Sequence, residues 1–375
     1  MACPPVVHTR QFMNHPLSRR HFLSALGLAA GSAGWNTGGA ALAGLAPTRR
    51  AGGPRLKTAL NAYSFSKLLN DHVKGRGAGM TLLQLCDFCA RHDFDAVDLT
   101  GYFFPGYPEV PADNVLFEVK RRAFDLGLDI SGTGVRNNFT TADKALRAEG
   151  VRHIQQWVEA AARLGAPVLR VFADTQMKSQ SWQTASAGAT REQVEEWIAA
   201  DLRTCAQQAA KFGVIIGVQN HGDFLQTGTE HLSLIQRVDS PWCGPIVDTG
   251  YYKSADPYAD MAQVAPFAVN WQIKESPFGA GHAVRTDLPR LLTLIQLAGY
   301  RGYLPIETLS AAGAEYDPFK VVPAFLAELR AAMEATSAVA PPTAPEESYP
   351  APSATSAKPA RKPPNKKKAR PLPPQ

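Results

Sequence analysis

The sequence predicts an α/β protein folded as a single (β/α)8 barrel, and three observations support this fold class. Short apolar runs rich in β-branched residues alternate with longer helical patterns along residues 56–335. Eight strand-and-helix units fit into this stretch of about 280 residues, which is the size of a (β/α)8 barrel. No Gly-x-Gly-x-x-Gly loop follows the first strand, and this absence disfavours a doubly wound open sheet, the alternative architecture.

Each expected strand is followed by a helical pattern. The strands are expected at residues 58–63, 96–100, 129–133, 167–172, 214–219, 245–248, 269–274 and 303–307. A helical pattern after the first strand places Leu82, Leu85, Cys86 and Cys89 on one face. Further helices are expected at 151–164, 191–212, 229–238, 288–298 and 318–332. Glycines at 127, 165, 213 and 299 stand where these helices end, before the next strand.

The charge of the chain is concentrated at its two ends. The chain has 375 residues and a formal net charge of +6, but residues 1–54 contain five Arg and no acidic residue. Residues 336–375 contain seven Lys or Arg and two Glu, so the body between these ends is acidic. An enzyme that acts on nucleic acid usually presents a basic working face. We therefore expect no nucleic-acid partner.

The N-terminus predicts a twin-arginine signal peptide over residues 1–43. Arg19 and Arg20 precede Phe22-Leu23 and a weakly apolar, Gly- and Ala-rich stretch, and Ala41-Leu42-Ala43 offers a cleavage site. The twin-arginine translocase would then be a partner and the mature protein periplasmic or otherwise exported. A disordered end with a chance Arg pair, an uncleaved anchor and a start at Met13 are the alternatives.

Two further segments flank the expected barrel of residues 56–335. Residues 44–55 are expected to be a linker. Residues 336–375 are rich in Pro, Ala, Ser and Lys and cannot bury enough apolar surface to fold, so we expect a disordered basic tail. This tail is either a solvated extension or an anchor to an anionic envelope polymer or lipid.

Polar residues follow the expected strands, and in a barrel the carboxyl ends of all strands meet at one mouth. They are Asn61, Tyr63, Asp98, Arg136, Asn137, Asn138, Arg170, Asp174, Gln219, Asn220, His221, Asp248, Gln272, Lys274 and Glu307. Buried polar side chains need partners, which a ligand, a metal or the other members of the set can supply.

The order of several short motifs resembles the xylose isomerase-like barrels of the sugar phosphate isomerase/epimerase superfamily. The matching segments are Gly217–His221, Ile246–Gly250, Trp271–Glu275 and Leu304–Glu307, and Asp95–Leu99 fits the second strand. Each segment is weakly specific by itself, but their order and spacing cover essentially all of the expected barrel.

The resemblance implies a divalent cation held by a Glu, an Asp, a His and a Glu on strands five to eight. These positions correspond to Gln219, Asp248, Gln272 and Glu307, so two of the four ligands are replaced by carboxamides. Such a set would bind a hard cation, Mn²⁺ or Mg²⁺, and bind it weakly. His221 could supply a nitrogen from another angle.

The same resemblance implies proton transfer next to a sugar carbonyl. Glu307 is the candidate base, His221 the partner acid, and Lys274 the group that stabilises an enolate oxygen. Gln219 cannot accept a proton, so a mechanism with two carboxylates cannot run through it. The candidate substrate-binding residues are Tyr63, Asn138, Arg170, Tyr251 and Trp271.

These observations leave three hypotheses for the function. The first is an exported sugar isomerase or epimerase, or a lyase that eliminates from an oxidised glycoside, because elimination needs only one base. The second is a degenerate barrel that binds a sugar or polyol without turnover. The third, remote because most of the expected His residues are absent, is an apurinic endonuclease-like hydrolase. A small carbohydrate is the expected ligand, and a homodimer is compatible with the resemblance.

Overall fold

The computed structural model describes residues 47, 50, 54–174, 181–309 and 315–337 of the 375-residue chain. The predicted signal peptide, most of the predicted linker and the predicted tail beyond residue 337 lie outside the described residues. Within the described part of the chain, no helix has both the length and the apolar character that a membrane span requires.

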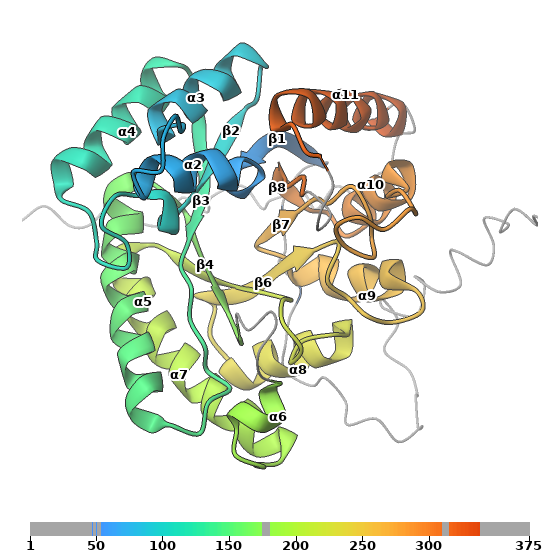
Figure 1. Cartoon of the computed structure of the whole chain (residues 1–375). Helices are drawn as coiled ribbons and strands as arrows, with labels where there is room; N and C mark the ends of the chain where they lie inside the picture. The colour runs from blue at the N-terminus through green and yellow to red at the C-terminus, as the bar shows by residue number, and fades with distance from the viewer. Residues whose placement is uncertain (1–46, 48–49, 51–53, 175–180, 310–314, 338–375) are drawn as a thin grey trace, which may run out of the picture. The chain divides into compact units, whose positions relative to one another are not determined.

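Eight parallel strands form a nearly closed barrel, which confirms the predicted fold class (Figure 1). The strands are β1 (Arg55–Asn61), β2 (Ala96–Thr100), β3 (Asp129–Gly134), β4 (Val168–Phe172), β5 (Ile215–Gln219), β6 (Cys243–Asp248), β7 (Asn270–Gln272) and β8 (Arg301–Ile306). Their order is β7-β6-β5-β4-β3-β2-β1-β8. A bridge between Ile273 and Ile306 joins the last two strands, where Ile273 N donates to Pro305 O at 2.8 Å.

Helices cover the outside of this barrel (Figure 1). They are α2 (Ser66–Val73), α3 (Leu82–Arg91), α4 (Asp113–Asp125), α5 (Lys144–Leu164), α6 (Trp182–Ala185), α7 (Arg191–Phe212), α8 (Gly228–Val238), α9 (Pro257–Val264), α10 (Leu288–Leu297) and α11 (Pro318–Ser337). Short 3₁₀ turns lie at Ala62–Phe65, Gly101–Phe103 and Ala265–Phe267. Neighbouring helices such as α5 and α7, and α10 and α11, pack against each other.

Local sequence signals explain where several helices start and stop. Thr81, Thr190 and Thr227 each form a capping box with the Gln or Glu three residues later. Gly165 and Gly213 end α5 and α7 in the left-handed conformation, with φ of 89° and 67°, which glycine adopts without a Cβ penalty. The helix starts are therefore specified by side-chain caps and these two ends by backbone freedom.

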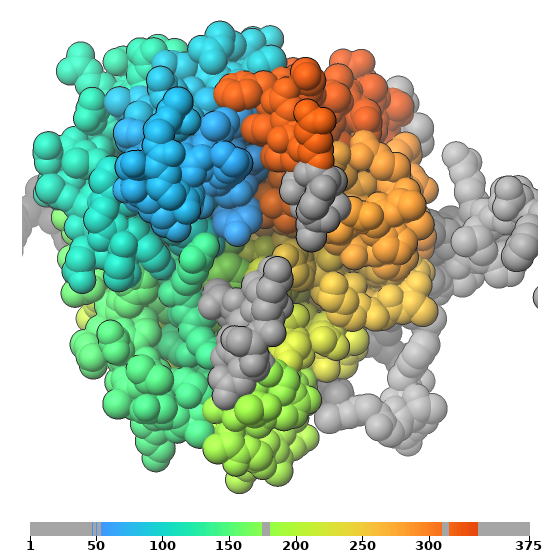
Figure 2. All heavy atoms as spheres, viewed as in Figure 1, coloured from blue at the N-terminus to red at the C-terminus, as the bar shows by residue number. Residues whose placement is uncertain are grey.

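The structure extends two of the predicted elements. β1 begins at Arg55, three residues before the predicted start, because its first residues pair in register with Arg301–Tyr303 of β8. α5 begins at Lys144, seven residues before the predicted start, because the Asp143 side chain accepts from Ala145 N and caps the helix. In Figure 2 the first units of the chain (blue) lie beside the last (orange and red), as the β1–β8 pairing requires.

The interior of the barrel is partly polar. Asn270 Nδ2 donates across it to Ser131 O at 3.3 Å, and Asn61 Nδ2 donates to Gln272 Oε1 at 2.7 Å. All four residues are buried. Side chains alternate along a strand, so the neighbours of these inward residues face the helices and form the apolar core. The polar interior continues into the mouth of the barrel at the carboxyl ends of the strands.

Candidate active site

A cavity of about 430 Å³ opens at the carboxyl ends of the barrel strands. Its lining residues are Tyr63, Tyr102, Arg136, Arg170, Phe172, Gln219, His221, Tyr251, Lys274, Glu307 and Leu309. Aromatic rings form much of its wall and charged groups lie among them. This combination suits a ligand that has both a stackable face and many oxygens, as a sugar does.

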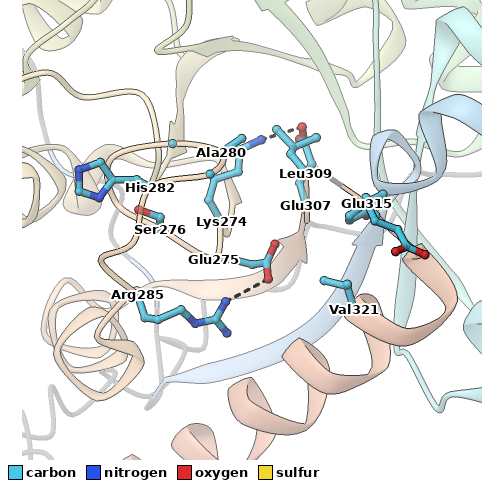
Figure 3. Close-up of a pocket in the computed structure, with 13 residues that line it drawn as sticks. Lys274, Glu275, Ser276, Ala280, His282, Arg285, Glu307, Leu309, Glu315 and Val321 are labelled. Atoms are coloured by element: carbon cyan, nitrogen blue, oxygen red, sulfur yellow. Dashed lines mark hydrogen bonds and ion pairs between the residues drawn. The ribbon is translucent and has the colours of Figure 1, made fainter. Parts of the chain in front are cut away.

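An ammonium group lies between two carboxylates at one side of this cavity. Lys274 Nζ is 2.6 Å from Glu307 Oε1 and 3.4 Å from Asp248 Oδ2. The side chains of Lys274 and Glu307 are only 5% and 7% exposed, and that of Asp248 is fully buried. Figure 3 shows the Lys274 side chain directed at the Glu307 carboxylate, whereas Glu275 turns away to pair with Arg285.

Burial and neighbouring charges have opposite effects on the pKa values of Lys274 and Asp248. Burial alone would lower the pKa of Lys274, but attraction to Asp248 and Glu307 more than offsets it, so the pKa is raised above its ordinary value. Burial raises the pKa of Asp248, and Lys274 limits that rise. The ammonium is therefore a permanent charge at physiological pH, held in place by the carboxylates it neutralises.

Gln219 links this ion group to a second cation. Its Nε2 donates to Asp248 Oδ2 at 2.5 Å, and its Oε1 accepts from Arg170 Nη1 at 3.0 Å. An amide suits this position because it presents a donor to the carboxylate and an acceptor to the guanidinium. Asn220 fixes the backbone of Asp248 by donating to its carbonyl at 2.9 Å and accepting from its N–H at 2.7 Å.

Arg170 crosses the floor of the cavity from β4. Its Nη2 donates to the Tyr102 hydroxyl at 3.1 Å and to Thr100 Oγ1 at 3.4 Å. Burial raises the pKa of Asp98 to about 6, and Arg170 opposes that rise. Within the described residues, Asp98 Oδ1 has no hydrogen-bond partner. The charges of Arg170 and Asp98 thus influence each other's pKa in the barrel interior.

His221 is a neutral ring in the cavity wall. Its ring stacks on Tyr251 with centroids 4.5 Å apart and contacts Phe172 edge-on. Burial, with the charges of Lys274 and Arg170, lowers its pKa to about 3. Its Nδ1 is buried without a hydrogen-bond partner among the described residues. A neutral imidazole with a free nitrogen serves better as a group that binds ligand than as the predicted partner acid.

The four positions that the resemblance assigns to a divalent cation do not form a fitting donor set. Asp248 and Glu307 face Lys274 Nζ, the Gln219 oxygen faces Arg170, and the Gln272 oxygen accepts from Asn61. Each of these four side chains thus already has an oxygen engaged by a protein donor. In the described ranges no group of three or more His, Cys, Asp and Glu is placed to hold a metal. The Mn²⁺ or Mg²⁺ site therefore stays a prediction from resemblance that this arrangement does not match.

Two of the predicted substrate-binding residues do not lie in this cavity. Trp271 is fully buried and packs edge-on against Tyr300 with centroids 6.0 Å apart. It points away from the barrel interior because Asn270 and Gln272, its neighbours on β7, point inward. Asn138 instead lines an adjoining cavity of about 700 Å³, and its Oδ1 accepts from Thr140. Tyr63, Arg170 and Tyr251 lie where the sequence predicts them.

Sequence reasoning did not select some residues of the wall as binding residues. Arg136 lines both cavities, and its guanidinium lies 4.4 Å from the centre of the Tyr102 ring. Arg136 follows a strand end, and position alone was the available signal for it. Phe172 ends β4 and Leu309 follows β8, and neither carries a polar group that would mark it in the sequence.

The chain belongs to the family described as the xylose isomerase-like TIM barrel, which matches residues 86–331. No curated protein sequence matches it. Among solved structures, the apo 3-keto-D-glucoside 4-epimerase from E. coli is 17% identical with a TM-score of 0.56, covering 74% of this chain and 99% of that chain.

Two other solved structures share the fold at a similarly low sequence identity. A D-allulose 3-epimerase from Methylomonas sp. is 16% identical with a TM-score of 0.59 and covers 74% of this chain and 98% of its own. An L-ribulose 3-epimerase is 18% identical with a TM-score of 0.57, covering 77% and 100%. These likenesses establish the barrel architecture, and the chemistry must be argued from the site.

Proposed function

We propose that this protein moves a proton at a carbon next to the carbonyl of a sugar or an oxidised glycoside. One observation carries the proposal: the Glu307 carboxylate lines a ring-walled cavity in contact with the Lys274 ammonium. Structural neighbours named as sugar epimerases, including one for a 3-keto-glucoside, support the same class of substrate. The activity is that of an isomerase, an epimerase or a lyase.

The chemistry follows from how charge moves between Glu307 and the substrate. When Glu307 takes a proton from the carbon next to the carbonyl, its negative charge is transferred to the carbonyl oxygen, which becomes an enolate. Lys274 remains beside Glu307 and the carbonyl oxygen, so it is the counter-ion before and after the proton transfer. Arg170 and Arg136 add donors in the same cavity. Fixed charges in a site shielded from water stabilise such an oxyanion without reorganising.

The fate of the enolate depends on which groups return the proton. Gln219 stands where the resemblance implies a second carboxylate, and a carboxamide does not act as an acid or a base at physiological pH. Return of a proton by Glu307 to the same carbon gives exchange. Its return to the former carbonyl carbon gives isomerisation, with the neighbouring hydroxyl proton moving to the enolate oxygen. Departure of a group from the next carbon gives elimination, which needs only this one base. Free sugars and glycosides are the proposed substrates, oxidised to a ketone where elimination occurs.

Sugar binding without turnover is the second candidate. The amides of Gln219 and Gln272 favour it, because they replace an acid and an imidazole with groups that only hydrogen-bond. The two candidates differ in one measurable property, since only an enzyme of the proposed class exchanges a carbon-bound proton with solvent.

Solvent exchange measured by proton NMR tests the proposal. The full chain is incubated in D₂O with 3-keto-glucosides and with ketohexoses, and loss of the signal from protons next to the carbonyl is followed. We expect exchange with the wild type and none with Glu307→Gln. Glu275→Gln is the matched control, because Glu275 is a nearby carboxylate that pairs with Arg285 instead. Binding with no exchange in any of these sugars would favour the sugar-binding barrel.

We further propose export through the twin-arginine pathway, on the basis of Arg19, Arg20 and the following Gly- and Ala-rich stretch. Replacing both arginines with lysine should retain the protein in the cytoplasmic fraction, as followed by cell fractionation and immunoblotting. Unchanged export of this double variant would contradict the proposal. The homodimer stays a prediction, which sedimentation of the mature protein would test.

A further inference from the structure

The Lys274 ammonium lies where the resemblance places a divalent cation, between the acids at the ends of β6 and β8. We infer that Lys274 replaces that cation, so that this barrel binds and polarises a substrate oxygen without a metal ion. The part of this inference that concerns the reaction rests on the proposed function. The part that concerns metal binding does not, because it can be measured without a substrate.

The position of the ammonium is fixed from both ends of the side chain. At its base, Lys274 N donates to Thr249 Oγ1 at 2.8 Å, and Lys274 O accepts from Thr286 Oγ1 at 2.7 Å. At its tip, Nζ pairs with Glu307 and Asp248. These contacts fix the backbone of Lys274 and pair the tip of its side chain with two carboxylates.

Gly250 makes room for the stem of this lysine. A Cβ built on Gly250 would lie 2.9 Å from Lys274 Cγ and 3.2 Å from Ser276 O. Contacts below 3 Å are essentially never seen for a Cβ, so any side chain here would displace the lysine stem. The backbone after β6 is therefore shaped around the lysine as well as around Asp248.

The charges of the site also balance with a monovalent cation. The ligand set implied by the resemblance has three carboxylates around a divalent cation, which sums to one negative charge. Here Gln219 removes one carboxylate, and Lys274 supplies one positive charge in place of two. The sum with Asp248 and Glu307 is again one negative charge. With an amide at position 219, the charge of Lys274 alone is enough to leave this sum.

An ammonium also retains the binding function of the cation. It carries three N–H donors, of which Glu307 and Asp248 account for two, and the third is available to a ligand in the cavity that Lys274 lines. The His221 Nδ1, which lacks a partner among the described residues, can accept from a hydroxyl of the same ligand. A polyhydroxylated carbonyl compound provides both an acceptor and donors.

Manganese titration of the full chain tests the inference. After dialysis against EDTA, MnCl₂ is titrated by calorimetry into the wild type, Lys274→Met and Lys253→Met, and thermal unfolding is recorded with Mn²⁺ and with EDTA. Lys253 is the matched control because it lies 5.3 Å from the Tyr251 ring without a carboxylate partner in the described contacts. We expect no binding and no shift in melting temperature for the wild type and the control.

For Lys274→Met we expect Mn²⁺ affinity to rise on the order of 100-fold or more, because the two carboxylates are freed from a competing positive charge. Stoichiometric binding of Mn²⁺ by the wild type, with stabilisation that EDTA reverses, would overturn the inference. Failure of a folded Lys274→Met to gain affinity would also overturn it. If that variant does not fold, the wild-type titration alone still decides.

Failure of the inference and failure of the proposed function give different results. Solvent exchange that requires added Mn²⁺ would overturn metal independence but support the proton transfer. Absence of exchange with and without Mn²⁺ would overturn the proton transfer, and the titrations would still show whether Lys274 excludes the metal.

Discussion

Restoring an acid at position 219 should destabilise the protein in a pH-dependent manner. In Gln219→Glu, a carboxylate oxygen replaces the amide nitrogen that donates to Asp248 Oδ2 at 2.5 Å in the wild type. The hydrogen bond is lost and two buried negative charges face each other. Lys274 is already shared by Asp248 and Glu307 and cannot neutralise a third acid.

The size of the effect follows from the distances. Two unit charges about 4 Å apart repel by about 4 kcal/mol at the effective dielectric constant typical of proteins. Attraction between the new carboxylate and Arg170, which now bonds the Gln219 oxygen at 3.0 Å, offsets part of this. We expect Gln219→Glu to lower the free energy of unfolding by roughly 2 kcal/mol at pH about 8.

The sign of the pH dependence is fixed by the direction of the pKa shift. Burial already raises the pKa of Asp248, and a second carboxylate raises it further. The folded variant then holds a proton that the unfolded chain releases. Its loss in free energy of unfolding relative to the wild type therefore vanishes below pH about 4 and grows as the pH rises. Urea unfolding at several pH values measures it.

The surface pair of Gln208 and Glu159 provides the matched control. Gln208 Nε2 donates to Glu159 Oε1 at 3.3 Å, and Gln208 Oε1 accepts from Lys211 at 3.2 Å, so the pattern of contacts is the same. Because solvent screens this pair, Gln208→Glu should cost less than about 0.5 kcal/mol. Equal stability of Gln219→Glu and the wild type at high pH would refute the account of the ion group.

Three further predictions concern the barrel and the cavity wall. Burial raises the pKa of Asp98 to about 6, so the folded protein gains stability as the pH falls through that value, and Asp98→Asn should remove roughly 3 kcal/mol of this gain between pH about 7 and about 4 in urea titrations. A pH dependence of stability that is unchanged by Asp98→Asn would contradict the assignment of the raised pKa to Asp98. Trp271→Ala should lower the free energy of unfolding by about 4 kcal/mol through the cavity left beside Tyr300, with ligand affinity of the folded protein unchanged. A large loss of affinity without loss of stability would return Trp271 to the binding site. His221→Phe should keep the stacking on Tyr251 but weaken sugar binding about tenfold in calorimetry, because Nδ1 is lost, and equal affinity would rule out that contact.

Much of the fold could be predicted because local sequence and global topology agree. The strand at Ala96–Thr100 and the helix at Arg191–Phe212 were predicted to the residue, since buried β-branched runs and a Thr-x-x-Gln cap are local signals. The start of β1 was missed because Arg55 and Lys57 resemble solvated loop residues. Their place in a strand depends on pairing with β8, far along the chain.

The proximity of several strand-end residues could be predicted, but their contacts could not. Strand-end position brought together Gln219, Asp248, Lys274 and Glu307, because parallel strands of a barrel end at one mouth. Which group the long lysine side chain would reach depends on four torsions and on the space at Gly250, and no local pattern encodes these. Resemblance alone suggested a metal where the folded chain places an ammonium.

The error at Trp271 had a signal that could have prevented it. Residues on a strand alternate between the two faces of a sheet, so Gln272 and Trp271 cannot both face the interior. Choosing Gln272 as an inward residue already directs Trp271 toward the helices, where it packs against Tyr300. Asn138 lies five residues beyond the end of the predicted third strand, and its position depends on a loop that alternation does not determine.

The most direct test of the account is the rate of solvent deuterium exchange next to a sugar carbonyl, measured by NMR with the full chain in excess EDTA. It tests at once the base at Glu307 and the ammonium of Lys274 as its permanent counter-ion. We predict exchange that is undiminished by the chelator and absent in Glu307→Gln. Exchange that stops with EDTA and returns with Mn²⁺ would contradict the metal-free site, and exchange that persists in Glu307→Gln would contradict the assigned base.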